Sequence, residues 1–204
     1  KRNMWALEYA SAAFRNDKEV VMSAVNRHWR LLEYASDELK ADKEVVMTAV
    51  NTFGYALKFA SKELQAEKDI VMVAVKTYGP ALKFASKELR DEKDIVMAAV
   101  KTYGPALKYA SKELQAEKDV VMIAVKTNGE ALEHASKEHQ VDKEVVMAAL
   151  ENGTRSSYEL AVRAYEFVSP GLKRDYDVIM AAMSYPYSSK YISIDFFIGL
   201  AQQV

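Results

Sequence analysis

Apolar positions recur along this chain in a pattern that repeats every 25 residues. The clearest marker is a methionine inside an apolar run, which occurs at Met22, Met47, Met72, Met97, Met122 and Met147. A fixed short period is typical of a solenoid, in which one supersecondary unit cannot bury its own apolar face and must stack on its neighbours. The pattern therefore predicts an all-α array in place of a globule with one central core.

Alignment on the methionines divides residues 1–183 into about seven repeats, followed by an apolar C-terminal tail over 184–204. The repeats that follow the pattern well span 5–29, 30–54, 55–79, 80–104, 105–129 and 130–153. Strong similarity between repeats defines their boundaries, since the third and fourth are identical at 21 of 25 positions. The predicted fold is an α-solenoid of helix-turn-helix repeats.

The last repeat, over 154–183, is a degenerate copy. Asp175 to Met180 repeats the pattern of Asp142 to Met147, but eight residues have been inserted between the two methionines. The insertion falls near 153–161 and contains threonine and serine, which favours a surface loop or a longer first helix in this repeat.

The first helix of each repeat is expected to be short and amphipathic. In the repeat over 80–104 it should run from Pro80 to about Leu89, because proline is well tolerated at the first helical position. Leu82 and Ala85 then lie on one face with Leu89, while Lys83 and its polar neighbours occupy the other.

The second helix of the same repeat is expected from Glu92 to Tyr103, and Gly104 is expected to end it in a left-handed conformation. Apolar residues follow one another from Ile95 to Val100. Such a helix must be covered by neighbours, which predicts a two-layer stack with second helices in one row and first helices in the other.

Aromatic side chains recur at one position of the first helix. They are Tyr9, Tyr34, Phe59, Phe84 and Tyr109, with His134 and Phe167 at the same position in the last two repeats. This aromatic row lies at the edge of the apolar stripe, where a ring can pack on the next repeat. A structural row is one interpretation, and a platform for bases or for a peptide is the other.

Lysines recur in pairs on the outer side of three successive first helices. They are Lys58 and Lys62, Lys83 and Lys87, and Lys108 and Lys112. One interpretation is a solvated face that nearby acids such as Glu63, Glu88 and Glu113 nearly neutralise. The other is a surface for an acidic protein partner, with nucleic acid a less favoured ligand.

The C-terminal tail carries a second group of candidate partner-binding residues. They are Tyr191, Ile192, Ile194, Phe196, Phe197, Ile198 and Leu200. An apolar segment of this kind has to be buried somewhere, and it is too short to cross a bilayer. It either folds back over the open flank of the last repeat or docks into another protein chain.

Composition and motifs argue against catalysis. Half of the residues are apolar, 28% are charged, the net charge is −1, and there is no cysteine. His134 and His139 are five residues apart, whereas two metal ligands on one helical face need a spacing of three or four. No phosphate loop or nucleophile motif stands out from the repeats. We therefore expect no enzyme activity, no cofactor and no metal site.

The motif itself resembles a known family. Residues 106–129, ALKYASKELQAEKDVVMIAVKTNG, are similar to the tandem unit of the domain of unknown function 4116 family. The resemblance covers 5–153 well and 165–183 loosely, while His28 and Trp29 depart from the Asn-Gly ending of the motif. It implies a helical array, and it carries over no catalytic or binding residues.

Together these observations predict a soluble, non-catalytic protein–protein interaction scaffold or linker subunit whose partners are other proteins of a larger complex. One alternative is a nucleic-acid-binding repeat protein that uses the lysines and the aromatic row. Another is a peripheral linker subunit of an organellar, photosynthetic membrane complex, with a targeting segment removed before Lys1. In each case there is no transmembrane segment, and any association with a membrane occurs through partners.

Overall fold

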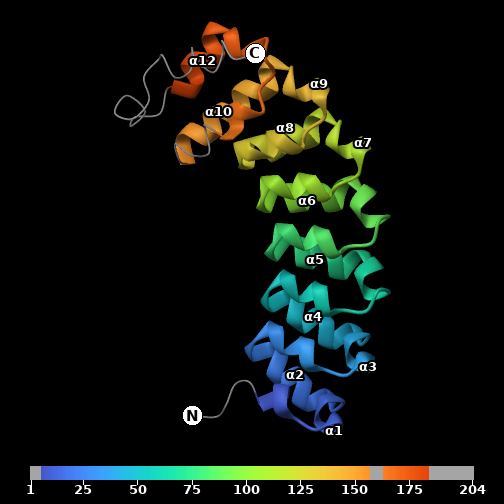
Figure 1. Cartoon of the computed structure of the whole chain (residues 1–204). Helices are drawn as coiled ribbons and strands as arrows, with labels where there is room; N and C mark the ends of the chain where they lie inside the picture. The colour runs from blue at the N-terminus through green and yellow to red at the C-terminus, as the bar shows by residue number, and fades with distance from the viewer. Residues whose placement is uncertain (1–5, 157–162, 184–204) are drawn as a thin grey trace. The chain divides into compact units, whose positions relative to one another are not determined.

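The computed structural model describes residues 6–156 and 163–183. It divides into an N-terminal half, residues 1–102, and a C-terminal half, residues 103–204, which are described separately. In both halves the regular structure of the described residues is helical, without strands (Figure 1). The predicted all-α solenoid of short repeats is confirmed.

In the N-terminal half each repeat combines a 3₁₀ helix (η), a second short helical piece and a longer α-helix. The elements are η1 (Ala6–Tyr9), α1 (Ala12–Arg15), α2 (Lys18–Arg27), η2 (Trp29–Tyr34), α3 (Asp37–Lys40), α4 (Lys43–Thr52), η3 (Gly54–Phe59), η4 (Leu64–Ala66), α5 (Lys68–Thr77), η5 (Gly79–Phe84), η6 (Leu89–Asp91) and α6 (Lys93–Thr102).

The C-terminal half continues the same order of elements. They are η7 (Gly104–Tyr109), α7 (Lys112–Gln115), α8 (Lys118–Thr127), η8 (Gly129–His134), α9 (Lys137–Gln140), α10 (Lys143–Ser156), η9 (Leu172–Arg174) and α12 (Tyr176–Met183).

The predicted first helix is not one helix. In the repeat over 80–104 it consists of η5 and η6, because Ala85 adopts an extended conformation with φ −65° and ψ 153° between them. Ser86 then opens the second piece, and its hydroxyl accepts a bond from the Leu89 amide at 3.4 Å. Serine competes for backbone donors in this way and favours helix starts over helix interiors. The predicted burial is nevertheless right, since Leu82, Ala85 and Leu89 are all buried.

The second helices form the apolar core of each repeat. In α4 the residues Val45, Val46, Ala49 and Val50 are fully buried. Each valine contributes roughly 1.5–3 kcal/mol of burial free energy, so the longer helix dominates the stability of a repeat. Met47, on the same helix, is only half-buried, so the helix is not covered on every side as predicted.

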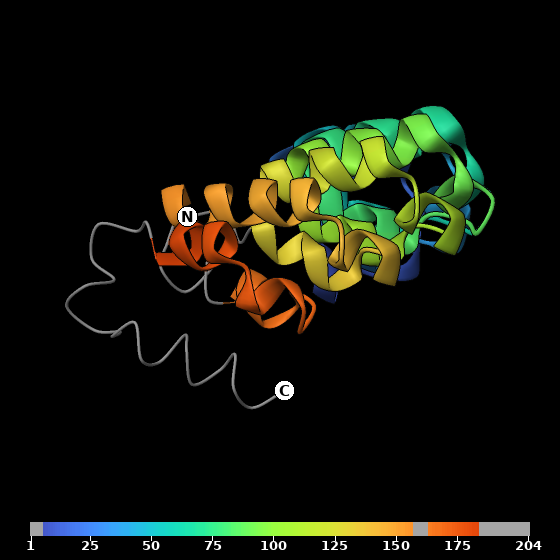
Figure 2. The same ribbon diagram turned by 90° about the horizontal axis from the view of Figure 1, so that it is seen from above.

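The elements pack in two layers, as expected. Within the N-terminal half α4 contacts α2 and α5, and α5 contacts α6, while η3 contacts both η2 and η5. Within the C-terminal half α10 lies between α8 and α12, and η7 contacts η8. Figure 2 shows the longer helices and the 3₁₀ segments in separate layers.

A backbone hydrogen bond ties each short helical piece to the next repeat. The Ser61 amide donates to the Lys40 carbonyl at 2.9 Å, and the Ser86 amide donates to the Gln65 carbonyl at the same distance. Equivalent bonds join Ser36 to Arg15, Ser136 to Gln115 and Ser169 to Gln140. The serine that interrupts the predicted first helix therefore also sets the register between repeats.

Gly104 does not end a helix in the predicted left-handed conformation, and no described residue has a positive φ. Tyr103, extended at φ −152° and ψ 101°, precedes η7, which begins at Gly104 itself. Glycine is required there by close approach, since a Cβ atom on Gly104 would lie 2.3 Å from the Ala124 carbonyl oxygen. The glycine therefore lets η7 pack directly on the backbone of α8.

The first residues of the insertion belong to the second helix of the sixth repeat and not to a longer first helix of the last repeat. They extend α10 to Ser156, so this helix is 14 residues long where α8 has 10. The alternative prediction, a surface loop, concerns mainly the residues that follow. Residues 157–162 lie outside the described part of the chain.

The close approach at glycine predicts the outcome of a paired substitution. Gly104→Ala should lower the free energy of unfolding by about 1–3 kcal/mol, because the new methyl group overlaps the Ala124 carbonyl. Gly171→Ala is the matched control, since no neighbouring atom lies within 4 Å of the place that its new methyl group would occupy. Urea unfolding followed by circular dichroism checks both, and equal midpoints for the two variants would contradict the packing described here.

Candidate interaction surface

The layer of 3₁₀ segments is closed by a buried glutamine in three of the described repeats. The Gln115 side chain is 6% exposed, and its amide donates to the Leu107 carbonyl and the Ala110 carbonyl, both at 3.1 Å. Gln65 and Gln140 make the same contacts in their own repeats. The glutamine holds the two short helical pieces together across the extended residue that separates them.

Two of the candidate lysines donate a hydrogen bond to the side-chain oxygen of this glutamine. Lys62 Nζ lies 2.9 Å from Gln65 Oε1, and Lys112 Nζ lies 2.9 Å from Gln115 Oε1. Lys137 repeats the contact with Gln140. A lysine at this position therefore has a structural role in addition to its charge.

The aromatic row lies where the sequence placed it, at the edge of the core. Phe59, Phe84 and Tyr109 are half-buried, whereas Tyr9 in the first repeat is 78% exposed. Rings outside the row pack against rings of the row in the next repeat. Tyr55 packs edge-on against Phe84 with ring centroids 5.2 Å apart.

The first aromatic cluster is built around an indole. Trp29 packs on Phe53 at 5.2 Å, on Tyr55 at 5.5 Å and on Phe59 at 6.4 Å, all between ring centroids. Tyr78 extends the cluster through a 4.7 Å contact with Phe53. Phe53, Tyr55 and Tyr78 were not among the predicted candidates. Phe53 and Tyr78 could have been found from their spacing, because each directly precedes the repeat glycine, whereas Tyr55 has no aromatic counterpart in the adjacent repeats.

Lysine and aromatic side chains form one surface. Lys58 Nζ lies 5.3 Å from the Phe59 ring centroid and 5.7 Å from that of Tyr55. Lys108 Nζ lies 4.9 Å from the centroid of Tyr109. Such contacts are attractive by about 0.5–1 kcal/mol at exposed sites, and they hold the ammonium groups against the protein surface.

Three of the predicted lysines meet at one depression in the N-terminal half. The N-terminal groove, of about 530 Å³, is lined by Lys58, Lys62, Lys83 and Arg90 together with Gln65, Phe84, Ala85 and Ser86. Four of these side chains are cationic and none is acidic. Arg90 stands at the repeat position that Gln65, Gln115 and Gln140 occupy, and its buried Nε has no hydrogen-bond partner among the described residues.

A second depression lies in the C-terminal half. The C-terminal groove, of about 370 Å³, is lined by Lys108, Lys112, Lys137, Gln115, Gln140, Glu133, His134, Ala135 and Ser136. Burial lowers the pKa of His134, so the imidazole is mainly neutral near pH 7. This groove is basic as well, although Glu133 offsets one of its three ammonium groups.

The remaining candidate residues do not line either groove, or they lie outside the described part of the chain. Lys87 is exposed beside the start of η6 and does not line the N-terminal groove. The tail residues Tyr191, Ile192, Ile194, Phe196, Phe197, Ile198 and Leu200 lie outside the described residues.

Two of the acids that were expected to neutralise the lysines form hydrogen bonds within their own helical segments. The Glu63 carboxylate is held by its own backbone amide and by the Ser61 hydroxyl, which lowers its pKa, and Glu88 is held in the same way by Ser86.

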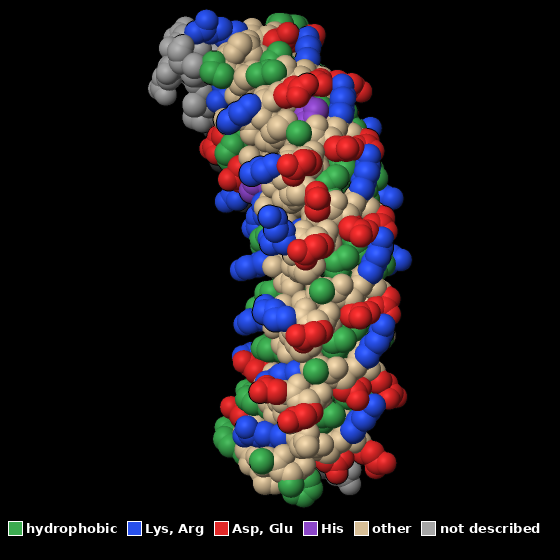
Figure 3. Space-filling model, turned by 90° about the vertical axis from the view of Figure 1, so that its right-hand side faces the viewer, with side chains coloured by type: hydrophobic (Ala, Val, Ile, Leu, Met, Phe, Trp, Pro, Cys, Tyr) green, Lys and Arg blue, Asp and Glu red, His purple; other side chains and the backbone are tan. Residues whose placement is uncertain are grey.

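Most ion pairs lie on another edge, at the starts of the second helices. The first lysine of each helix contacts two carboxylates of the next repeat. Lys118 Nζ lies 2.8 Å from Asp142 and 2.7 Å from Glu144. Lys18, Lys43, Lys68 and Lys143 do the same within their own halves. Figure 3 shows acidic and basic side chains gathered in columns on this side of each half.

This ion-pair ladder uses two carboxylates for each lysine. It therefore concentrates negative charge at the helix starts, and the grooves on the other layer retain positive charge although the net charge of the chain is only −1. In the last repeat Tyr176, 73% exposed, stands where the other helices begin with lysine.

Further features bear on the classes of function. Among residues 6–156 and 163–183, no helix combines the length and apolar character needed to cross a membrane. The same residues contain no group of three or more histidine, cysteine or acidic side chains placed to hold a metal ion.

Comparison with known proteins identifies one family. A family model described as "Domain of unknown function (DUF4116)" matches seven overlapping segments of the chain, 1–40, 17–65, 42–90, 67–115, 93–140, 117–161 and 142–197. No curated protein and no solved structure matches the chain.

Removal of the buried glutamine should loosen a repeat. Gln115→Leu keeps most of the volume but takes the donor away from the buried Ala110 carbonyl, so we expect a loss of about 1–3 kcal/mol in the free energy of unfolding. Lys112→Ala removes only the outer contact and should cost less than about 0.5 kcal/mol. Thermal unfolding of both variants checks this, and an unchanged melting temperature for Gln115→Leu would refute the role given to the amide.

The ion-pair ladder predicts sensitivity to acid. Hydrogen bonding to Lys118 lowers the pKa of Asp142, and Lys18 does the same for Asp42. Because the folded-state pKa is lowered, the stabilisation is present above the unfolded value near 4 and is lost as the pH falls through the folded value. The melting temperature should therefore drop below about pH 4.

The double variant Asp42→Asn/Asp142→Asn keeps oxygen atoms for the helix caps but removes both titrations. Its melting temperature should fall less steeply with acid than that of the unmodified chain. Parallel slopes for the two proteins between about pH 5 and 3 would show that these carboxylates do not contribute.

Proposed function

The chain belongs to the DUF4116 family, and we propose that it is a non-catalytic protein–protein interaction scaffold, a linker subunit that holds acidic segments of partner proteins. The observation that carries this proposal is the pair of basic grooves on the 3₁₀ layer. Each groove joins two successive repeats, and equivalent positions of the two grooves, such as Lys58 and Lys108, lie two repeats apart in the sequence. Recurrence of one site along a repeat surface is how solenoid proteins bind extended partners.

The chemistry of the grooves favours carboxylates. Lys58, Lys83 and Arg90 converge on the N-terminal groove, and no acidic side chain lines it. Its volume of about 530 Å³ accommodates a few side chains of an extended segment and not a whole domain. Charge complementarity of this kind speeds association and selects the partner more than it adds affinity.

Nucleic acid is the competing ligand, and the state of the aromatic rings weighs against it. Stacking of bases needs an exposed ring face. Phe59 has Lys58 over its ring and Trp29 stacked at 6.4 Å with an interplanar angle of 24°. Phe84 is met edge-on by Tyr55. These rings are occupied within the protein, which supports an acidic protein partner over a strand of bases.

The absence of catalysis is part of the proposal. Ser136 and His134 both line the C-terminal groove, but the Ser136 hydroxyl makes no hydrogen bond to any described residue. Nucleophilic catalysis by serine depends on a hydrogen bond to an adjacent base. The groove is therefore better suited to binding than to reaction.

The test measures the binding of two anionic probes to the unmodified chain and to one charge-reversal variant. Fluorescently labelled polyglutamate and a single-stranded oligouridine of similar charge are titrated with the chain, and anisotropy reports binding. Lys58→Glu/Lys83→Glu should weaken polyglutamate binding about tenfold or more, because two ammonium groups of the groove become carboxylates.

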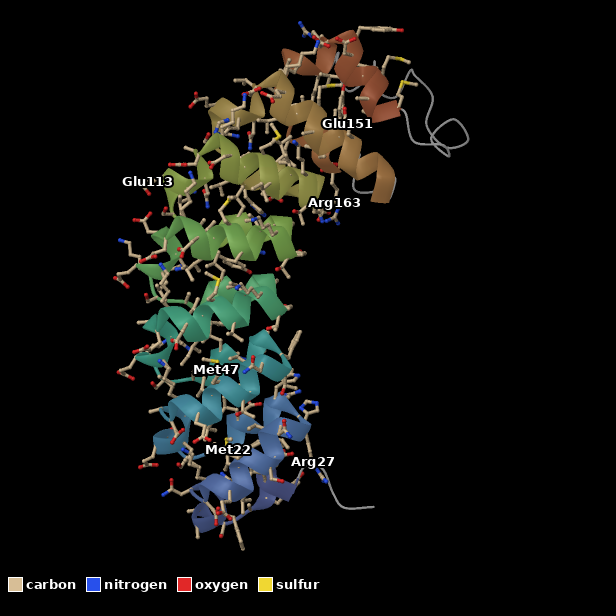
Figure 4. The ribbon with its side chains drawn as sticks, turned by 180° about the vertical axis from the view of Figure 1, so that it is seen from behind. Met22, Arg27, Met47, Glu113, Glu151 and Arg163 are labelled. Atoms are coloured by element: carbon tan, nitrogen blue, oxygen red, sulfur yellow. The ribbon has the colours of Figure 1, made fainter. Side chains whose placement is uncertain are left out.

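The control changes the same charge elsewhere. Arg27→Glu/Arg163→Glu alters two arginines that Figure 4 places at the helix-end edge of their respective halves, and neither of them lines a basic groove. It should leave polyglutamate binding nearly unchanged. Tighter binding of oligouridine than of polyglutamate, with a steep dependence on salt, would transfer the proposal to nucleic acid. Equal effects of the two variants would show that net charge alone is responsible.

A further inference from the structure

The layer of second helices carries a surface of a different kind. Between α5 and α6 lies a depression of about 680 Å³, the methionine groove, whose lining includes Met72, Met97, Lys76 and Lys101. We propose that this groove binds an amphipathic α-helix of a partner protein, with apolar residues on the methionines and acidic residues on the two lysines. The inference goes beyond the proposed function, because it concerns the other layer and another class of ligand.

The methionines are not needed to close the core. In α6 the residues Ile95, Val96, Ala99 and Val100 are fully buried, whereas Met97 stays half-exposed. The core positions use short or branched side chains, and the long unbranched thioether is kept for the surface. Methionine adapts its shape to different apolar partners, which is why it is common on surfaces that bind helices.

The charge available in the groove is positive. Asp94 also lines it, but Lys68 lies 3.0 Å from this carboxylate and offsets its charge. Lys76 and Lys101 are exposed, and among the described residues neither makes an ion pair. A partner with acidic residues beside its apolar face therefore complements the groove, whereas a basic one is repelled.

The shape of the groove favours a helix. Its walls are two helices of 10 residues that pack side by side. At about 1.5 Å per residue each wall is roughly 15 Å long, which matches two to three turns of a third helix. Ridges of a helix fit the groove between two others, and a helix satisfies most of its backbone hydrogen bonds internally, which a single strand does not.

The chain provides its own comparison site. Met22 on α2 and Met47 on α4 occupy the same repeat position, and Figure 4 shows both near the middle of their helices. The residues that correspond to Lys76 and Lys101 are Asn26 and Asn51. The pair α2 and α4 therefore offers methionine without lysine, and it should bind an acidic helix less well.

The first experiment uses methyl NMR on the full chain with ¹³C-methyl methionine. The probe is a designed amphipathic peptide of about 18 residues, long enough to form a helix, with leucine on one face and glutamate on its flanks. Its addition should shift the methyl signals of Met72 and Met97 and leave that of Met22 in place. A peptide with lysine flanks, or one with the same composition in scrambled order, should shift neither. Equal shifts with any of these controls, or shifts at Met22 alone, would overturn the proposal.

The second experiment measures affinity by fluorescence anisotropy of the same peptide. Lys76→Glu/Lys101→Glu and Met97→Glu should each weaken binding about tenfold. Met22→Glu is the matched control and should leave the affinity unchanged. Loss of binding in the Lys58 variant, with retention in the Lys76 variant, would place the helix in the N-terminal basic groove and end this proposal, whatever the outcome for polyglutamate.

Discussion

Burial of apolar surface between neighbouring repeats is the interaction on which the rest of this structure depends. No repeat has enough apolar volume of its own. In α4, α5, α6 and α8 the longer helix buries three valine or isoleucine side chains and an alanine, and it shares them with neighbouring helices. The segments η3, η5, η7 and η8 each bury one alanine and one leucine. The stability of such a chain is approximately a sum of the contributions of its repeats and of the interfaces between them. A weak interface therefore destabilises the repeats beside it before it unfolds the whole chain.

Three residue types recur at these joints, and the glutamine acts in three of the described repeats. Glycine lets the 3₁₀ segment touch the backbone of the following long helix, as the 2.3 Å approach at Gly104 shows. Serine donates its amide to the preceding repeat, and glutamine ties the two short pieces within a repeat. His139 departs from the repeat pattern beside one of these joints. It replaces the usual buried leucine, bonds to the Ala116 carbonyl at 2.8 Å, and leaves its Nδ1 buried without a partner among the described residues.

Periodicity in the sequence was enough to predict the helical class, the two layers and the buried positions, because all of these follow from where apolar side chains recur. It was not enough to predict the break at Ala85 and Ser86. One continuous helix and two short helical pieces would bury the same residues in this segment. The apolar pattern therefore cannot distinguish them, and only the backbone geometry does. The role of Gly104 was mistaken for a similar reason, since a glycine near a helix end fits a left-handed cap as well as a close approach.

The lysine pairs remain candidates for an interaction surface, and the structure brings Lys58, Lys62 and Lys83 to one groove. Arg90 was overlooked, although basic residues also stand at its repeat position as Arg15 and Lys40. The ion-pair ladder was overlooked too, because its partners are 24 and 26 residues apart and meet only when one repeat stacks on the next.

The recurrence of one joint has a consequence for how such proteins can change. Because each groove is built from two consecutive repeats and each joint uses the same contacts, removal or duplication of one whole 25-residue segment cuts through no core. It moves every later groove by one step along the array. Under the proposed function, the number of residues that separates two grooves therefore changes only in multiples of one repeat.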